Sequence, residues 1–289
     1  MLLFLFYEHH GECGTNEEYT RKHKHPNGVR SKAIFQYQPT KQSINYLRNS
    51  DKEVEDAHID THLILWQIQT NKIMSQLKHA FAEKLLRIKA IKLQPNNPFT
   101  WASGWNSPIY TDNRIALSYP DVRSFVKLEL CHAIHEHFPE ATAVAGVATG
   151  AIAQGALVAD ELELPYAYVR PKPKDHGTKN QIEGRLPEGA KVVVVEDLIS
   201  TGSSSLKAVD ALREAGFEVV GMVASYTYGF PVAEEAFAKA GLKLVTLGDY
   251  DHTIEIAAET GYVSKEDIEV LKEWRKNPAE WQAPAAKAE

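Results

Sequence analysis

The chain has 289 residues, of which 44% are apolar and 24% are charged, as is ordinary for a globular protein. Its formal net charge of -6 argues against a general binder of nucleic acid or of anionic membranes, so a site for an anionic ligand must be a local basic cluster. The two cysteines, Cys13 and Cys131, make no disulfide framework and fit a reducing cytoplasm. No apolar run approaches the ~18 residues that span a bilayer, and the apolar start lacks the basic region of a signal peptide.

The first 73 residues differ in pattern from the rest. They are rich in His, Lys, Asn, Gln and Glu, and their only apolar stretch, Ile59 to Ile68, is short. We predict that residues 1–73 form an irregular, disordered extension that is dispensable, with Met74 as the natural start. The alternative is a regulatory or partner-binding arm in which the Ile59–Ile68 stretch docks as a helix.

From Met74 onward, helices and strands alternate. A helical face begins the region, with Leu77, Phe81, Leu85 and Ile88 on one side. The patterns then predict strands over 143–147, 165–169, 191–195, 219–224 and 242–247. Helices are expected over 151–161, from the Ser/Thr/Gly loop to 215, over 232–240, and from a Ser264 cap to Pro278. This alternation predicts an α/β domain over 74–276 with a parallel sheet and helices on both faces, and a flexible tail over 277–289.

The segment VVVVEDLISTGSSS, from Val192 to Ser205, is the most informative one. Four valines predict a strand buried on both faces, and Glu196 and Asp197 stand where it ends. A loop of small residues then leads into a helix, whose free N–H groups and dipole can hold a phosphate. The acid pair suits a ligand that also carries hydroxyls or a metal. The segment has neither a Walker nor a Rossmann fingerprint, and the alternative is an ordinary βα unit with a polar loop.

Three further segments carry chemistry. The stretch 170–177, RPKPKDHG, is a long basic loop suited to a polyanion such as pyrophosphate, or else a solvated loop. The aromatic stretch 98–112 could form a flat pocket for a planar heterocycle, or else a packed β-hairpin. The turn 146–151 could be a second backbone cradle for pyrophosphate, or a place of close helix–sheet packing.

The order of these segments resembles the orotate phosphoribosyltransferases, a branch of the type I phosphoribosyltransferase family. The resemblance covers about Met74 to Trp274 and is carried by FTWASGWNSPIYTDNR, RPKPKDHG, NQIEG and VVVVEDLISTGSSSLKAV. It implies the type I phosphoribosyltransferase fold with a small N-terminal hood around 94–119. It also implies the reaction of orotate with phosphoribosyl pyrophosphate (PRPP) to give orotidine 5′-monophosphate and pyrophosphate, with Mg²⁺.

The resemblance also implies roles for particular residues. Glu196 and Asp197 face the ribose hydroxyls and are catalytic together with Lys174. Arg170, Lys174 and His176 contact PRPP, and Lys174 reaches into the neighbouring subunit's site, which implies a homodimer. Orotate is contacted by Ser200, Ser103 and Gly104. Mg²⁺ is held by substrate oxygens rather than by a protein metal site. The PRPP loop consists of Leu198, Ile199, Ser200, Thr201, Gly202, Ser203 and Ser204.

The chain departs from the family pattern at several positions. Many members have a lysine where this chain has Ala102, and some have a lysine where it has Gly150 or Pro171. Some members also bind the orotate carboxylate with an arginine after the penultimate strand, and residues 225–229 of this chain contain no arginine. The residue that holds the orotate carboxylate is therefore unassigned. Two alternatives stay open: a phosphoribosyltransferase for another base, and a PRPP-sensing regulator without catalysis. The hood and the Lys174/His176 loop favour an enzyme acting on orotate, with no nucleic-acid or membrane partner.

Overall fold

The computed structural model describes residues 72, 74–101, 104–172 and 181–282. The chain divides into two units, Met1–Thr61 and His62–Glu289, and every described residue belongs to the second. Within the described residues, no helix is long and apolar enough to cross a membrane. The predicted boundary at residue 74 falls within a helical stretch, since residue 72 and residues 74–87 are helical, and it stays a prediction.

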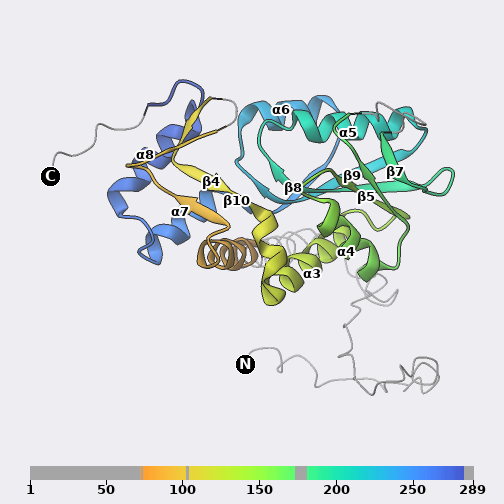
Figure 1. Ribbon diagram of the computed structural model, residues 1–289, viewed down its shortest axis with the longest axis horizontal. Coiled ribbons are helices and arrows are strands. Elements are labelled where there is room, and N and C mark those ends of the chain that lie inside the picture. Colours follow the sequence, from red (N-terminus) through yellow and green to blue (C-terminus); the bar gives the residue numbers. More distant parts are fainter. Residues whose placement is uncertain (1–71, 73, 102–103, 173–180, 283–289) are drawn as a thin grey trace, which may run out of the picture. The chain divides into compact units, whose positions relative to one another are not determined.

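A six-stranded sheet forms the centre of this unit (Figure 1). Its strand order is β10 (Leu244–Asp249), β9 (Glu218–Thr227), β8 (Lys191–Ile199), β5 (Ala143–Val147), β6 (Tyr166–Val169) and β7 (Ile182–Gly184). All neighbours are parallel except β6 and β7, which are antiparallel. The predicted parallel sheet is thus confirmed, with one antiparallel edge strand. Strand β7 was not predicted, because its side chains are half-buried or exposed and show no apolar pattern.

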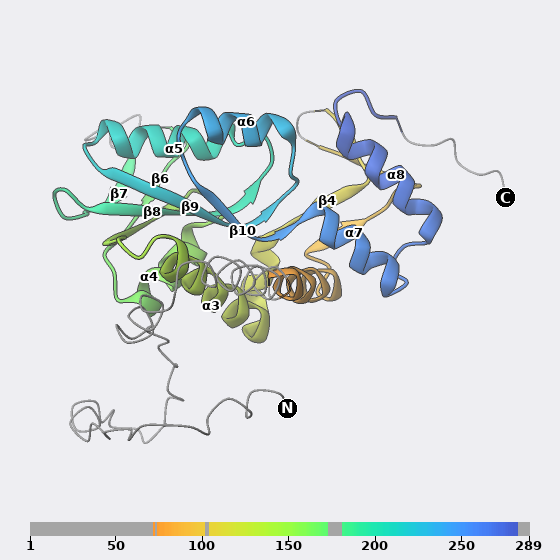
Figure 2. The same cartoon turned by 180° about the vertical axis from the view of Figure 1, so that it is seen from behind.

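Helices cover both faces of the sheet, as predicted (Figures 1 and 2). One face carries α5 (Ser203–Glu214) and α6 (Pro231–Lys239), and the other carries α3 (Pro120–His137) and α4 (Ile152–Leu162). Val192 and Val194 belong to the core cluster that includes Leu212 of α5, while Val193 and Val195 belong to the cluster that includes Leu130 of α3. Four consecutive valines are therefore all buried because successive side chains of a strand point to opposite faces.

Strand β8 is longer than predicted. It continues through Ile199, so the expectation that it ends before Glu196 and Asp197 is wrong. The reason is its pairing with β9, in which Glu196 lies opposite Ala224 and Ile199 lies opposite Thr227. Backbone pairing outlasts the apolar run, and both acids consequently sit on a paired strand rather than on a loop.

The aromatic segment forms small antiparallel sheets. β1 (Ile91–Leu93) pairs with β4 (Ile109–Thr111), and β2 (Phe99–Thr100) pairs with β3 (Asn106–Ser107). The Trp101 ring lies 5.1 Å from the Tyr228 ring and 5.5 Å from the Trp274 ring, centroid to centroid. Trp101 is therefore part of a packed β-hairpin, which was the alternative interpretation of this segment in the sequence analysis.

The C-terminal helices follow β10. They are α7 (Tyr250–Glu259) and α8 (Lys265–Lys276). The Ser264 cap is confirmed as a capping box, in which the backbone N–H of Asp267 donates to Ser264 Oγ at 3.2 Å and the Ser264 N–H donates to the Asp267 carboxylate at 3.1 Å. The Trp274 indole N–H donates to the carbonyl of Asn106 at 3.1 Å. This bond ties α8 to the hairpin of the aromatic segment.

Candidate active site

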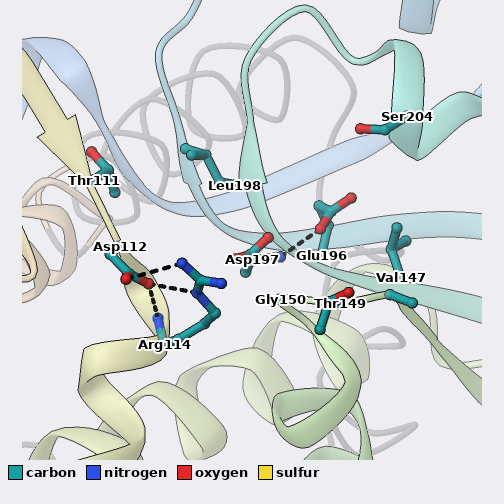
Figure 3. Close-up of a pocket in the computed structure, with 11 residues that line it drawn as sticks. Thr111, Asp112, Arg114, Val147, Thr149, Gly150, Glu196, Asp197, Leu198 and Ser204 are labelled. Atoms are coloured by element: carbon teal, nitrogen blue, oxygen red, sulfur yellow. Dashed lines mark hydrogen bonds and ion pairs between the residues drawn. The ribbon is translucent and has the colours of Figure 1, made fainter. Parts of the chain in front are cut away.

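A pocket of about 340 Å³ opens at the C-terminal ends of β5 and β8 (Figure 3). We call it the acidic pocket because three carboxyl groups line it, from Asp112, Glu196 and Asp197. Its volume suits a small molecule, and the carboxyl ends of parallel strands are the usual place for a ligand. The remaining lining residues are Thr111, Arg114, Val147, Ala148, Thr149, Gly150, Leu198 and Ser204.

Glu196 is fixed by hydrogen bonds on both carboxyl oxygens. The backbone N–H of Asp197 donates to one oxygen at 2.9 Å, and the Ser205 hydroxyl donates to the other at 2.7 Å. The residue is only 4% exposed. Burial, and after it the adjacent Asp197, raise the pKa of Glu196 well above its usual value, so its protonated form is favoured. Glu196 is therefore rigid and pre-oriented before any ligand arrives.

Asp197 lies over a glycine. A Cβ added at Gly150 would come within 2.0 Å of an Asp197 carboxyl oxygen, so no side chain fits there without moving Asp197. The Asn113 amide also donates to the backbone carbonyl of Asp197. The lysine that some relatives carry at the position of Gly150 would collide with Asp197 in this arrangement. This departure from the family pattern is thus matched to the local packing.

Asp112 and Arg114 form a two-point ion pair at the rim of the acidic pocket. The guanidinium Nε donates to one Asp112 oxygen at 2.7 Å, and Nη2 donates to the other at 3.0 Å. Asp112 also accepts from the backbone N–H of Arg114 and so caps the 3₁₀ helix η2 (Asn113–Ser118). The hydrogen bond from Arg114 lowers the pKa of Asp112 despite its partial burial. Asp112 is therefore charged at neutral pH and holds Arg114 in place.

A second pocket, of about 430 Å³, adjoins the first and shares Val147, Ala148 and Ser204 with it. We call it the basic pocket, because Arg170, Lys172 and Lys207 line it and no acidic residue is among its described lining. The other lining residues are Val169, Pro171, Gln181, Thr201, Ser203 and Ala208.

The N-terminus of α5 points a helix dipole at the basic pocket, since the helix begins at Ser203. Gly202 precedes it with φ +77°, and a Cβ there would meet the Phe237 ring at 2.8 Å. Only glycine satisfies both conditions, so the small-residue loop has the shape that close approach of an anion requires.

The structure brings half of the predicted site residues to the linings of these two pockets. Glu196, Asp197, Leu198 and Ser204 line the acidic one, and Arg170, Thr201, Ser203 and Ser204 line the basic one. Arg170 also pairs with Glu183 across 3.4 Å.

None of the other predicted residues that the structure describes lines either pocket. Ile199 is buried in the core, Ser200 is half-buried outside both linings, and Gly104 is exposed at the hairpin turn. Lys174, His176 and Ser103 lie outside the described residues.

Sequence reasoning assigned no role to Asp112, Arg114 or Lys207. A usable signal existed for the first two, because an acid and an arginine two residues apart directly follow a short strand inside the segment that carried the family resemblance. Among the described ranges, no cluster of three or more His, Cys, Asp or Glu side chains could hold a metal.

Comparison with known proteins identifies the family. A model of the phosphoribosyl transferase domain matches residues 129–245. The chain is 65% identical over 210 residues to an orotate phosphoribosyltransferase of Bacteroides thetaiotaomicron, covering 73% of this chain and 99% of the relative. An orotate phosphoribosyltransferase of Lactococcus lactis subsp. cremoris is 54% identical, covering 72% and 99%. The crystal structure of orotate phosphoribosyltransferase from Aeropyrum pernix matches with a TM-score of 0.56 and 32% identity, over 63% of this chain and 99% of that one. This chain therefore belongs to the orotate phosphoribosyltransferase family.

Proposed function

We propose that this chain transfers the 5-phosphoribosyl group of PRPP to orotate, giving orotidine 5′-monophosphate and pyrophosphate. The observation that carries the proposal is the junction of the two pockets. Glu196 and Asp197 line one pocket, the phosphate-type loop lines the other, and Ser204 belongs to both. A sugar that carries a phosphate at one end and a leaving group at the other needs these two environments side by side.

The reaction breaks the bond between ribose C1′ and the pyrophosphate oxygen and forms a bond between C1′ and N1 of orotate, and the proton of N1 is released. Positive charge develops on the ribose as pyrophosphate leaves, and the carboxyl groups of Glu196 and Asp197 stabilise it while they hold the hydroxyls. The 5′-phosphate binds the backbone N–H groups of the loop at the start of α5. Arg170 and Lys172 offset negative charge on the phosphate groups.

Phosphoribosyltransferases generally use Mg²⁺ with PRPP. The donors present here fit an ion bound mainly by substrate oxygens, because the acidic pocket offers adjacent carboxyl groups but no cage of three ligands among its described residues. When bound, Mg²⁺ would neutralise charge on the departing pyrophosphate. We place the reaction in the cytoplasm, since two cysteines in 289 residues fit a reducing compartment.

Lys174 completes the proposal by acting on pyrophosphate in the neighbouring subunit of a homodimer. Support comes from the basic composition of its segment and from the family resemblance. We expect Lys174→Ala to lower kcat more than it weakens PRPP binding, because a cation on the departing pyrophosphate contributes mainly at the transition state. After subunit exchange with an Asp197→Asn variant, hybrid dimers should regain one working site. If verified hybrids stay inactive, the trans arrangement is refuted.

The test of the reaction itself is a spectrophotometric assay of orotate consumption with PRPP and Mg²⁺, run beside uracil, adenine and hypoxanthine. We expect consumption of orotate alone. Consumption of another base in preference to orotate would support the alternative of a different substrate. Binding of PRPP without consumption of any base would instead support the regulator.

A further inference from the structure

Orotate is an anion, and the charged side chains that line the acidic pocket are mainly carboxyl groups. Its carboxylate is attached to C6, next to the N1 atom that bonds to ribose. If the proposed function holds, this anion must enter a pocket lined by the carboxyl groups of Asp112, Glu196 and Asp197. A carboxylate such as Asp112 repels a second carboxylate a few ångströms away in a partly desolvated site, and a protonated Glu196 supplies no positive charge, so the pocket needs a cation to accept orotate.

Arg114 is the one cationic side chain among the described residues that line the acidic pocket. The other nearby cations, Arg170, Lys172 and Lys207, line the basic pocket instead. The segment 225–229, where some relatives carry an arginine for this purpose, reads SYTYG in this chain. Arg114 therefore supplies a positive charge in the acidic pocket, which residues 225–229 of this chain do not supply.

The guanidinium of Arg114 is oriented for a second partner. Its Nε and Nη2 atoms are engaged by Asp112, while Nη1 makes no hydrogen bond to any described residue. Figure 3 shows the group directed from η2 into the pocket, on the side of Asp197. Hydrogen bonds and charge from Asp112, with a smaller contribution from Asp197, raise the pKa of Arg114, so it stays charged. The side chain is 56% exposed, which leaves its outer edge open to a ligand.

We propose that Arg114 binds the carboxylate of orotate and that Asp112 is the positioning residue that aims it. A planar guanidinium matches a planar carboxylate through paired N–H donors, which a lysine does not reproduce. With the ribose held at Glu196 and Asp197, N1 of the base and its neighbouring carboxylate fall in the same pocket as Arg114. The assignment rests on the proposed function and supplies the specificity residue that the sequence left unassigned.

The test compares two nucleotides that differ only in this carboxylate, orotidine 5′-monophosphate and uridine 5′-monophosphate. Their Kd values are measured by calorimetry for the wild type, Arg114→Met and Arg114→Lys. We expect Arg114→Met to weaken the orotidine nucleotide about 10- to 100-fold, as for loss of a charged hydrogen-bonded pair, and to leave the uridine nucleotide almost unchanged. Arg114→Lys should lie between. Equal weakening of both nucleotides, or of neither, overturns the assignment.

Arg87→Met is the matched control, because Arg87 also pairs with an aspartate at 2.8 Å but lines neither pocket. It should bind both nucleotides as the wild type does. For the positioning role, Asp112→Asn should raise KM for orotate severalfold and leave KM for PRPP unchanged, and added salt should not fully restore KM for orotate. An orotate KM equal to that of the wild type would remove Asp112 from the proposal. A wild-type protein that does not consume orotate would refute the proposed function. If the wild type is active and Arg114→Met still prefers orotidine 5′-monophosphate to uridine 5′-monophosphate as strongly as the wild type does, only this inference is refuted.

Discussion

The two pockets differ in how their charged groups are held. In the acidic pocket, Glu196 is 4% exposed with both oxygens bonded, and Arg114 is clamped by Asp112. In the basic pocket, Lys172 and Lys207 are exposed on the surface. The first pocket acts through fixed geometry and should fail when one atom is displaced. The basic pocket acts through the number of its positive charges. Ligand binding there should tolerate the loss of one charged side chain and should weaken as the salt concentration rises.

The largest effect should come from replacing both fixed acids with amides. Glu196→Gln combined with Asp197→Asn should lower kcat about 10²- to 10³-fold, because the developing charge on the ribose loses its stabilisation. The measurement is steady-state turnover with orotate and PRPP. As a control, Asp210→Asn with Glu214→Gln changes two exposed acids of α5 and should keep wild-type rates. Wild-type turnover in the first variant would remove the acids from catalysis.

A single methyl group should disturb the same geometry. Gly150→Ala places a Cβ against the Asp197 carboxylate, which must rotate away, and we expect kcat to fall on the order of tenfold or more. Combining it with Asp197→Asn gives a double-mutant cycle. If the methyl acts through Asp197, the two losses will be far from additive. Strict additivity in that cycle would assign the loss to another cause.

The basic pocket should respond weakly to the loss of one charge. Lys207→Ala should raise KM for PRPP only a fewfold and leave kcat unchanged, because an exposed charge contributes roughly 0.2–1 kcal/mol. Raising the salt concentration should reduce the difference in KM for PRPP between the variant and the wild type. The matched control is Lys239→Ala on α6, which is exposed and lines neither pocket. If Lys207→Ala lowers kcat as much as the double amide variant does, the two pockets do not differ in their tolerance of substitution.

The smallest expected effect is on stability. The pKa of Glu196 is raised by burial above its usual 4.5, so the folded state holds this proton more tightly than the unfolded chain does. The wild type therefore loses stability as pH rises from the unfolded pKa through the folded one, whereas glutamine does not ionise. We expect the Tm of Glu196→Gln, measured relative to the Tm of the wild type, to increase as the pH rises above about 4.5, by roughly 2–4 °C for each kcal/mol. A Tm difference that is independent of pH would contradict the raised pKa.

The sequence predicted the parts of the molecule that local pattern encodes. The buried valines, the acid pair and the small-residue loop lie next to one another in the chain, so their chemistry could be read directly. The end of β8 could not, because its last residues owe their strand conformation to pairing with β9 rather than to apolar pattern. Helix α3 was missed although a signal existed, since Val122, Val126, Leu130 and Ile134 recur at four-residue spacing after Pro120.

The role of Arg114 depends on proximity that no local pattern shows. Asn113 and Asp197 are 84 residues apart, and only the folded chain brings η2 against β8. The tight space at Gly150 depends on the same proximity, because a Cβ there would meet the Asp197 carboxylate. Sequence thus found the residues that are grouped along the chain, and the structure added those that meet across it.

A crystal structure with orotidine 5′-monophosphate bound is the most direct test of how the two pockets share one nucleotide. We predict the phosphate on the backbone N–H groups of residues 201–204 and the ribose hydroxyls within hydrogen-bond distance of Glu196 or Asp197. We also predict the pyrimidine ring in the acidic pocket with its carboxylate at Arg114. A ribose bound away from both acids, or a phosphate held outside the loop at the start of α5, would contradict this prediction.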